Sequence, residues 1–298
     1  MPSLASRLLP LIMTLGGAKR RFSSADVMRA KVARLRRYPA RHAPPGLLLT
    51  SVDIRVQIIA GWSVYEISPR GAVAPRRALY LHGGAYVYEI ALAHWLLVAD
   101  LAVSTGSRFI VPIYPLAPAE TAATIVPKAT DLAAALIAEV GAEATHILGD
   151  SAGGGMALAV AMQLRDRGLP APHSTVLISP WLDISGTDPA LAVIAPRDPW
   201  LAVPGSHAAG EIYRGDLPED DPIVSPIHGD LTGLGAITMF SGTRDILNAD
   251  ARRLMRLAKG IDFAIDYHEE REMIHVYPLL PIPEGKQARD IIRRVMIS

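Results

Sequence analysis

The sequence predicts an α/β fold, in which a mostly parallel central sheet is flanked by helices and covered by a helical cap. Half of the 298 residues are hydrophobic, which supplies enough apolar surface to bury a sheet on both faces. Short β-rich runs alternate with segments of helical apolar spacing, the order that parallel strands joined by crossover helices produce. Residues 182–225, rich in proline and aspartate, interrupt this alternation and predict a cap insertion between two core strands.

The first 45 residues form the other predicted piece of the cap. Their apolar run, residues 8–15, is far shorter than the ~20 residues of a membrane-spanning helix. Only Arg7 precedes this run, whereas Lys19, Arg20 and Arg21 follow it, so we interpret it as a structural helix and not as a signal peptide. A helix lying over a pocket is favoured, and a helix lying on a membrane surface is the alternative. Pro44-Pro45-Gly46 ends the segment at a domain boundary.

Residues 46–181 and 226–298 form the predicted main domain. Alternating apolar residues from position 47 to about position 69, with a turn at Gly61, predict an antiparallel hairpin. The following strands are predicted at residues 78–82, 109–114, 146–149, 175–179, 237–241 and 263–267. Helices are predicted at residues 95–103, 126–140, 156–167, 249–259 and 286–296.

Composition excludes several classes of function. Thirty basic and 29 acidic residues leave a formal charge of +1, too weak a field to indicate a nucleic-acid partner. The chain has no cysteine, which rules out disulfides and thiolate metal sites. No spacing typical of a metal site or a nucleotide cofactor occurs, so we expect neither. We expect a cytoplasmic protein and leave a homodimer open.

The pentapeptide Gly149-Asp150-Ser151-Ala152-Gly153 is the strongest motif. It satisfies G-x-S-x-G, with a strand-like run before it and a small-residue helix after it. Such a serine stands on a sharp strand-to-helix turn, where the flanking glycines leave room that a Cβ would fill. The alternative is a glycine-rich turn that holds a phosphate, but the chain lacks the Walker spacing that would favour it. We therefore predict that Ser151 is the nucleophile of an α/β-hydrolase fold.

A second glycine-rich loop, His82-Gly83-Gly84-Ala85, also follows a predicted strand. Esterases use an HGGG-type loop here to donate backbone N–H groups to the oxyanion. We expect Gly83, Gly84 and Ala85 to form this arm of the oxyanion hole, and Ala152 to add a further N–H. His82 is interpreted as holding the loop by hydrogen bonds and not as a proton carrier.

These motifs resemble the bacterial hormone-sensitive-lipase-like carboxylesterases, also called family IV, of the α/β-hydrolase superfamily. The resemblance extends over most of the chain. It includes a Y-R-L-A-P-E-like segment from Tyr114 to Glu120, in which Pro115 replaces arginine. It implies that Asp245, in Gly242-Thr243-Arg244-Asp245, is the catalytic acid and that His275, 30 residues later, is the base. The chain order Ser, Asp, His agrees with this fold.

Other acids and histidines were weighed for the same roles. Asp183 is an alternative acid, whereas Asp250 is interpreted as a first-turn helix charge. His268 is assigned a structural or solvent-facing place at a strand end. The remaining histidines have no motif around them and are assigned to packing or to the surface: His94, His146, His173, His207 and His228.

The predicted function is that of a serine carboxylesterase working through an acyl-enzyme intermediate, with no metal or cofactor. The family resemblance implies a small-molecule substrate with a short- to medium-chain acyl group. Tyr86, Tyr88, Trp200 and Leu201 are candidates for the pocket lining, with plain packing as the alternative for each. Two other functions stay open: a non-catalytic receptor for a small ligand on the same fold, and an amidase or acyltransferase with the same triad.

Overall fold

The computed structural model describes residues 2–298 and confirms the α/β class. Within this range one eight-stranded sheet runs in the order β1-β2-β4-β3-β5-β6-β7-β8. The hairpin strands β1 and β2 pair antiparallel, β2 is antiparallel to β4, and the other neighbours are parallel. The strands are β1 Val52–Ile59, β2 Trp62–Pro69, β3 Arg76–Leu81, β4 Ser107–Ile113, β5 Thr145–Asp150, β6 Ser174–Ile178, β7 Ile237–Gly242 and β8 Ile265–Glu270.

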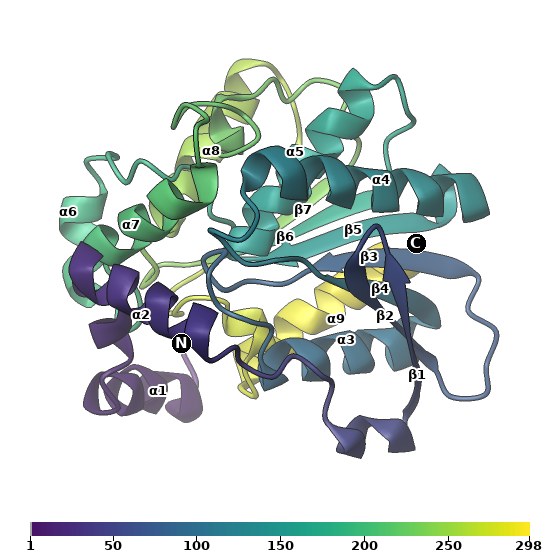
Figure 1. Cartoon of the computed structure of the whole chain (residues 1–298), viewed down its shortest axis with the longest axis horizontal. Helices are drawn as coiled ribbons and strands as arrows, with labels where there is room; N and C mark the ends of the chain where they lie inside the picture. Colours follow the sequence, from purple (N-terminus) through teal and green to yellow (C-terminus); the bar gives the residue numbers. More distant parts are fainter. Residues whose placement is uncertain (1) are drawn as a thin grey trace.

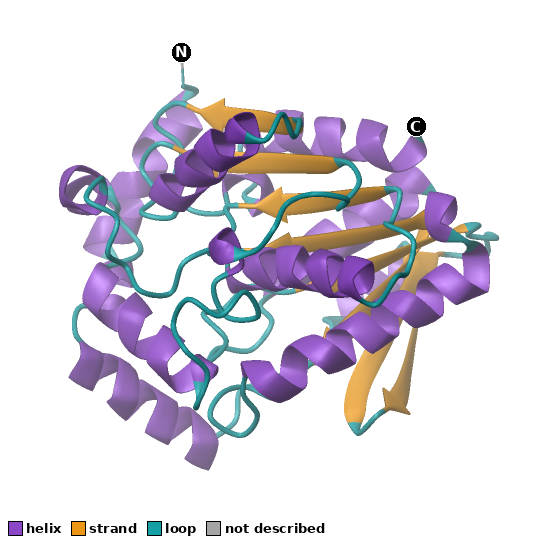
Figure 2. Ribbon diagram, turned by 90° about the horizontal axis from the view of Figure 1, so that it is seen from above, coloured by secondary structure: helices purple, strands orange, loops and turns teal. Residues whose placement is uncertain are grey.

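Helices cover both faces of the sheet (Figure 1). The helices α4 Ala122–Val140, α5 Ala152–Asp166 and α8 Asn248–Gly260 bury their apolar sides in the core of one face. The helices α3 Leu92–Thr105 and α9 Pro283–Ile297 do so on the other face. Every residue of the central strands β5 and β6 is buried, as expected for parallel strands that helices cover on both faces. Figure 2 shows the β1–β2 hairpin twisted away from the other strands.

The N-terminal segment comprises α1 Leu4–Leu15, η1 Ala18–Phe22 and α2 Ala25–Arg37, and the 182–225 segment comprises α6 Leu191–Ile194, η4 Ala195–Arg197 and α7 Val203–Arg214. Helix α2 packs against α7. A Cβ at Gly205 would lie 2.4 Å from the Cα of Phe22, so glycine permits this close approach of α7 to η1. The remaining short helices are η2 Gly46–Thr50, η3 Ala142–Ala144, η5 Pro226–His228 and η6 Tyr277–Leu279.

We expected helix α1 to cover the pocket, but it lies elsewhere. It packs against α9, and Ser6 Oγ donates a hydrogen bond to Glu284 Oε1 at 3.1 Å. The cavity beside Ser151 is lined from Arg21 onward, with no contribution from residues 2–15. The expectation was wrong because helical periodicity shows that a face is apolar but not what lies against it. None of the helices formed by residues 2–298 has both the length and the apolar character needed to cross a membrane.

The observed elements differ from the predicted ones mainly at their ends. Helix α5 begins at Ala152 and not at residue 156, because Gly153, Gly154 and Gly155 have low helix propensity and conceal its first turn in the sequence. Strand β8 begins two residues later than predicted and continues to Glu270 through polar residues. These shifts leave the order of elements unchanged.

Candidate active site

Ser151 stands on a strained turn between β5 and α5. Its backbone has φ 54° and ψ −122°, a conformation that residues with a side chain rarely adopt. A Cβ at Gly149 would lie 2.1 Å from the carbonyl oxygen of Gly153, and a Cβ at Gly153 would lie 2.0 Å from that of Leu81. Both motif glycines are therefore required by close backbone contacts. The turn is held by Ser151 N–H, which donates to the Ile178 carbonyl at 2.8 Å.

The three residues expected to form the triad lie within hydrogen-bond distance of one another. His275 Nε2 lies 2.9 Å from Ser151 Oγ, and His275 Nδ1 lies 2.8 Å from Asp245 Oδ2. An ionised carboxylate only accepts hydrogen bonds, so Nδ1 carries the hydrogen and Nε2 is left to accept the serine proton. All three side chains are buried, and Asp245 is fully so.

The charge environment favours a basic imidazole at His275. Burial by itself would lower the pKa of His275, but the neighbouring Asp245 carboxylate and its hydrogen bond raise it above the ordinary value. Asp245 Oδ1 is held in turn by the N–H of Leu247 at 2.9 Å. The imidazole also meets Trp200 edge to face, with the ring centroids 5.6 Å apart.

Asp198 supports the triad from the 182–225 segment and was missed in the sequence. Its Oδ1 accepts the N–H groups of Trp200 and Leu201 at 2.7 and 2.8 Å, and its Oδ2 accepts that of Ile246 at 2.9 Å. Burial, together with the nearby Asp245, raises the pKa of Asp198 to about 6. The carboxylate thus fixes a pocket-lining segment onto the loop that carries Asp245. The only sequence signal was an aspartate two and three residues before the amides it accepts, a common turn pattern.

Gly84 and Ala85, in the loop after β3, line the same cavity as Ser151. Gly84, with φ 132°, and Ala85, with φ 51°, adopt positive φ. A Cβ at Gly84 would lie 2.4 Å from the Tyr88 carbonyl oxygen. Across residues 2–298, the N–H groups of Gly84, Ala85 and Ala152 make no hydrogen bond. Gly83 differs from the expectation, because its N–H donates to Asp150 Oδ1 at 2.9 Å and is not available to an oxyanion.

Asp150 connects the serine turn to this loop. It accepts hydrogen bonds from Tyr80 Oη at 2.6 Å, from Gly83 N–H and from His94 Nε2 at 3.2 Å. His94 Nδ1 accepts the Ala91 N–H, so its Nε2 carries the hydrogen. Burial alone would raise the pKa of Asp150, but His94 and these hydrogen bonds lower it. His94 therefore has a positioning contact, whereas the sequence suggested only packing or surface for it.

His82 holds the loop, as expected. Its Nδ1 lies 2.7 Å from the Gly83 carbonyl oxygen, and its ring stacks on Tyr114 with centroids 4.4 Å apart. Burial lowers the pKa of His82 to about 4, so the ring is neutral near pH 7. Tyr114 Oη donates to the His82 carbonyl at 2.6 Å, which gives the Tyr114–Glu120 segment a structural role.

A cavity of about 440 Å³ opens onto Ser151 and His275. Tyr88, Trp200 and Leu201 line it, as expected. Tyr86 does not, because its ring is sandwiched between Trp181 and Tyr213 and its hydroxyl donates to the Ala152 carbonyl at 2.7 Å. The other lining residues are Arg21, Phe22, Lys31, Leu35, Ala40, Arg41, Gly84, Ala85, Glu89, Ile90, Ala91, Ala93, His94, Asp150, Trp181, Ser206, Leu247, Val276, Leu279 and Leu280.

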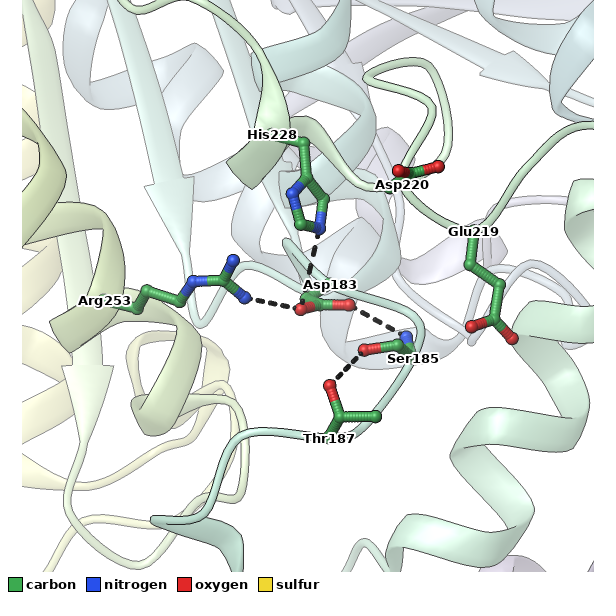
Figure 3. A pocket seen from close by; sticks show the side chains of 7 residues that line it. All are labelled: Asp183, Ser185, Thr187, Glu219, Asp220, His228 and Arg253. Atoms are coloured by element: carbon green, nitrogen blue, oxygen red, sulfur yellow. Dashed lines mark hydrogen bonds and ion pairs between the residues drawn. The ribbon is translucent and has the colours of Figure 1, made fainter.

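The alternative acid Asp183 lies in a different, polar pocket of about 510 Å³ (Figure 3). Its carboxylate accepts from Arg253 Nη1 at 2.7 Å and from the Ser185 N–H at 2.9 Å. Asp250 lies in the first turn of α8, as expected, but it is also buried and accepts the N–H groups of Leu182 and Asp183, both at 3.1 Å. Burial, with Asp183 nearby, raises the pKa of Asp250 well above the ordinary value. Neither aspartate contacts His275.

Within the described residues, one group of three side chains has donor atoms close enough together to hold a metal ion. His207, Glu211 and Glu219 have donor atoms within 4.8 Å of one another. Glu211 is already paired with Arg214, at 2.7 Å, and none of the three lines the cavity beside Ser151. His268 lies apart from both, stacked on Phe240 and 3.0 Å from Asp266.

Comparisons with known proteins agree with this geometry. Residues 78–279 match the model of a family described as having the alpha/beta hydrolase fold. A triacylglycerol lipase of Mycobacterium tuberculosis is 35% identical over 70% of this chain, which covers 44% of that protein. An acetyl-hydrolase of Streptomyces hygroscopicus is 32% identical, covering 72% of this chain and 73% of that protein. The crystal structure of an esterase from the bacterial hormone-sensitive lipase family superposes with a TM-score of 0.82 at 27% identity, covering 100% of this chain and 98% of the other.

Proposed function

The chain belongs to the hormone-sensitive-lipase-like carboxylesterases of the α/β-hydrolase superfamily, and from this premise we propose that it hydrolyses short- to medium-chain acyl esters through an acyl-enzyme intermediate. One observation carries the proposal: Ser151 Oγ, His275 and Asp245 form a continuous buried hydrogen-bonded series, with distances of 2.9 and 2.8 Å. The contact between hydroxyl and imidazole is what nucleophilic attack by a serine requires.

In the first half of the reaction, Ser151 Oγ attacks the ester carbonyl carbon while His275 Nε2 takes the serine proton. Asp245 keeps the Nδ1–H tautomer in place and stabilises the imidazolium that forms. The new negative charge falls on the carbonyl oxygen, near the unpaired N–H groups of Gly84, Ala85 and Ala152. Collapse of this intermediate expels the alcohol, which takes the proton from His275, and leaves the acyl group on Ser151.

In the second half, water attacks the acyl carbon while His275 takes its proton. The same three amides receive the second oxyanion, and His275 then returns a proton to Ser151 Oγ as the acid leaves. The Gly83 N–H has a different task, because its bond to Asp150 fixes the loop relative to the serine turn. A network that holds these amides in place before the reaction avoids reorganisation during it.

The size and lining of the cavity support the choice of substrate. Its volume, about 440 Å³, is at the lower end of the range for small-molecule pockets. Tyr88, Trp200 and Leu201 give it an apolar wall suited to an acyl chain. The proposed cap, residues 1–45 with residues 182–225, supplies this wall through Trp200 and Leu201. A cytoplasmic location and a homodimer stay predictions of the sequence.

The test is hydrolysis of p-nitrophenyl esters from acetate to laurate by the wild-type chain and by Ser151→Ala. We expect turnover to peak at short to medium chains and to fall at least about 10³-fold in the variant, whose fold should be unchanged by circular dichroism. Retained turnover in the variant would refute Ser151. An inactive wild-type chain that binds an ester would favour the receptor alternative. A preference for amide substrates would favour an amidase, and transfer of the acyl group to an alcohol would favour an acyltransferase.

A further inference from the structure

Helix α1 turns its apolar side toward solvent. The side chains of its leucine stripe and of one isoleucine are 48–79% exposed: Leu4, Leu8, Leu11, Ile12 and Leu15. The spacing of positions 4, 8, 11 and 15 places the four leucines on one face of the helix. Ser6 and Pro10 are its buried residues. The helix therefore contacts the protein through Ser6, Pro10 and the half-buried Leu9, and it leaves its leucine stripe uncovered.

A buried carboxylate holds α1 in this orientation. Glu284, at the start of α9, accepts hydrogen bonds from the Ser3 N–H, from Ser3 Oγ at 2.9 Å and from Ser6 Oγ at 3.1 Å. Glu284 is only 8% exposed. Rotating α1 to bury its leucines would break these three hydrogen bonds to a buried carboxylate, which is costly. The outward leucines are thus part of the folded arrangement.

The segment that carries α1 is strongly basic. Residues 1–45 contain ten Lys and Arg residues and one acidic residue, Asp26, whereas the rest of the chain has 20 basic and 28 acidic residues. Most of these cations are exposed, including Arg20 and Arg21 of η1 and Arg34 and Arg36 of α2. Helices α1 and α2 lie at the same end of the molecule (Figure 1). The near-neutral total charge conceals this separation.

We propose that the N-terminal surface, formed by α1, η1 and α2, docks on a membrane that contains anionic lipids. The exposed leucines of α1 enter the boundary between headgroups and acyl chains, and the surrounding cations attract the lipid phosphates. The positive charge of this surface argues against a second copy of the chain as its binding partner. A symmetric dimer through this surface would bring two strongly basic segments together.

Docking would also bring the catalytic cavity to the lipid. Arg21, Lys31 and Arg41, from the same segment, lie at the wall of the cavity that leads to Ser151. An ester dissolved in the membrane then has a short path to the nucleophile. This consequence rests on the proposed function, whereas the docking itself does not require catalysis.

Flotation with vesicles tests the docking. The full chain should float with vesicles of 70% phosphatidylcholine and 30% phosphatidylglycerol, and with pure phosphatidylcholine vesicles about tenfold less. Leu11→Glu combined with Leu15→Glu should reduce binding to the anionic vesicles at least about tenfold. The matched control is Val56→Glu with Ile58→Glu, which changes two exposed apolar residues of the hairpin strand β1. Binding by this control should equal that of the wild type.

Other readouts separate the docking from its alternatives. Both double variants should keep wild-type turnover of soluble p-nitrophenyl butyrate, because none of these residues lines the cavity. Ser151→Ala should bind vesicles like the wild type, so an inactive enzyme would not affect this result. Three outcomes would overturn the proposal: no flotation of the wild type, equal flotation with both vesicle types, or a light-scattering mass that falls from dimer to monomer in the α1 variant.

Discussion

Two cavities of this molecule are each lined by a histidine that lies next to an aspartate, but the surroundings of the two pairs differ. In the cavity of about 440 Å³, Asp245 holds His275 at 2.8 Å, and the other nitrogen of the imidazole faces Ser151. In the polar pocket of about 510 Å³, His228 Nε2 lies 3.9 Å from Asp183, whose carboxylate is taken by Arg253 (Figure 3). The hydroxyl of Ser185, which also lines this pocket, is paired with that of Thr187 at 2.9 Å.

The difference teaches that residue type alone does not identify a catalytic site in this fold. The polar pocket also has an imidazole, a guanidinium and a hydroxyl, but its Asp183 carboxylate is bound by Arg253 and the Ser185 hydroxyl is paired with Thr187. The cavity beside Ser151 combines strained backbone at Ser151 and Ala85 with amides that lack acceptors within the described chain. Strain and unpaired donors cost folding free energy, so their presence together points to function.

The largest expected effect is the difference in kcat between variants of Asp245 and of Asp183. Asp245→Asn should lower kcat for p-nitrophenyl butyrate by about 10⁴-fold, because the amide favours the wrong tautomer of His275. Asp183→Asn, the matched change in the polar pocket, should leave kcat within about twofold. Thermal melts of both variants would show that they are folded. Equal losses in the two variants would contradict the distinction between the cavities.

The pH dependence of kcat/KM should separate Asp198 from Asp183. His275 acts as a base only when it is neutral, so activity should rise with pH, with an apparent pKa above the ordinary value of about 6.5. Asp198 helps to raise the pKa of His275, and Asp198→Asn should therefore move this rise to lower pH. Asp183→Asn should leave the profile in place. A shift of the profile to higher pH in Asp198→Asn would contradict the inference that the Asp198 carboxylate raises the pKa of His275.

The smallest effect concerns the strain at Ala85, which stands where the family has its third glycine. Ala85→Gly should stabilise the fold by about 0.5–1 kcal/mol. Glycine adopts φ 51° without the strain that the alanine Cβ causes, and this gain exceeds the greater loss of backbone entropy that glycine suffers on folding. Turnover should stay within about threefold. Ala60→Gly, with φ 49° at the tip of the β1–β2 hairpin, is the control outside the cavity and should gain similar stability. A lower melting temperature for Ala85→Gly alone would mean that the methyl group packs favourably.

Local chemistry made much of this protein predictable from its sequence. The glycines around Ser151 are needed by contacts within a few residues and with one neighbouring strand, so the motif carries its own geometry. Apolar runs marked the central strands because those strands are buried on both faces. The family resemblance then added Asp245 and His275 to the predicted triad, and the structure brings both within hydrogen-bond distance of their expected partners.

Tertiary contacts decided the rest. The buried bonds of Asp198 and His94 join residues 48 and 56 positions apart, and no local pattern encodes such pairs. Tyr86 does not line the cavity, because its ring stacks on Tyr213, which is far along the chain. Helix α1 was recognisable as amphipathic, but Glu284 determines which face looks outward. A sequence records which side chains prefer burial, whereas only the assembled fold determines which of them find a partner.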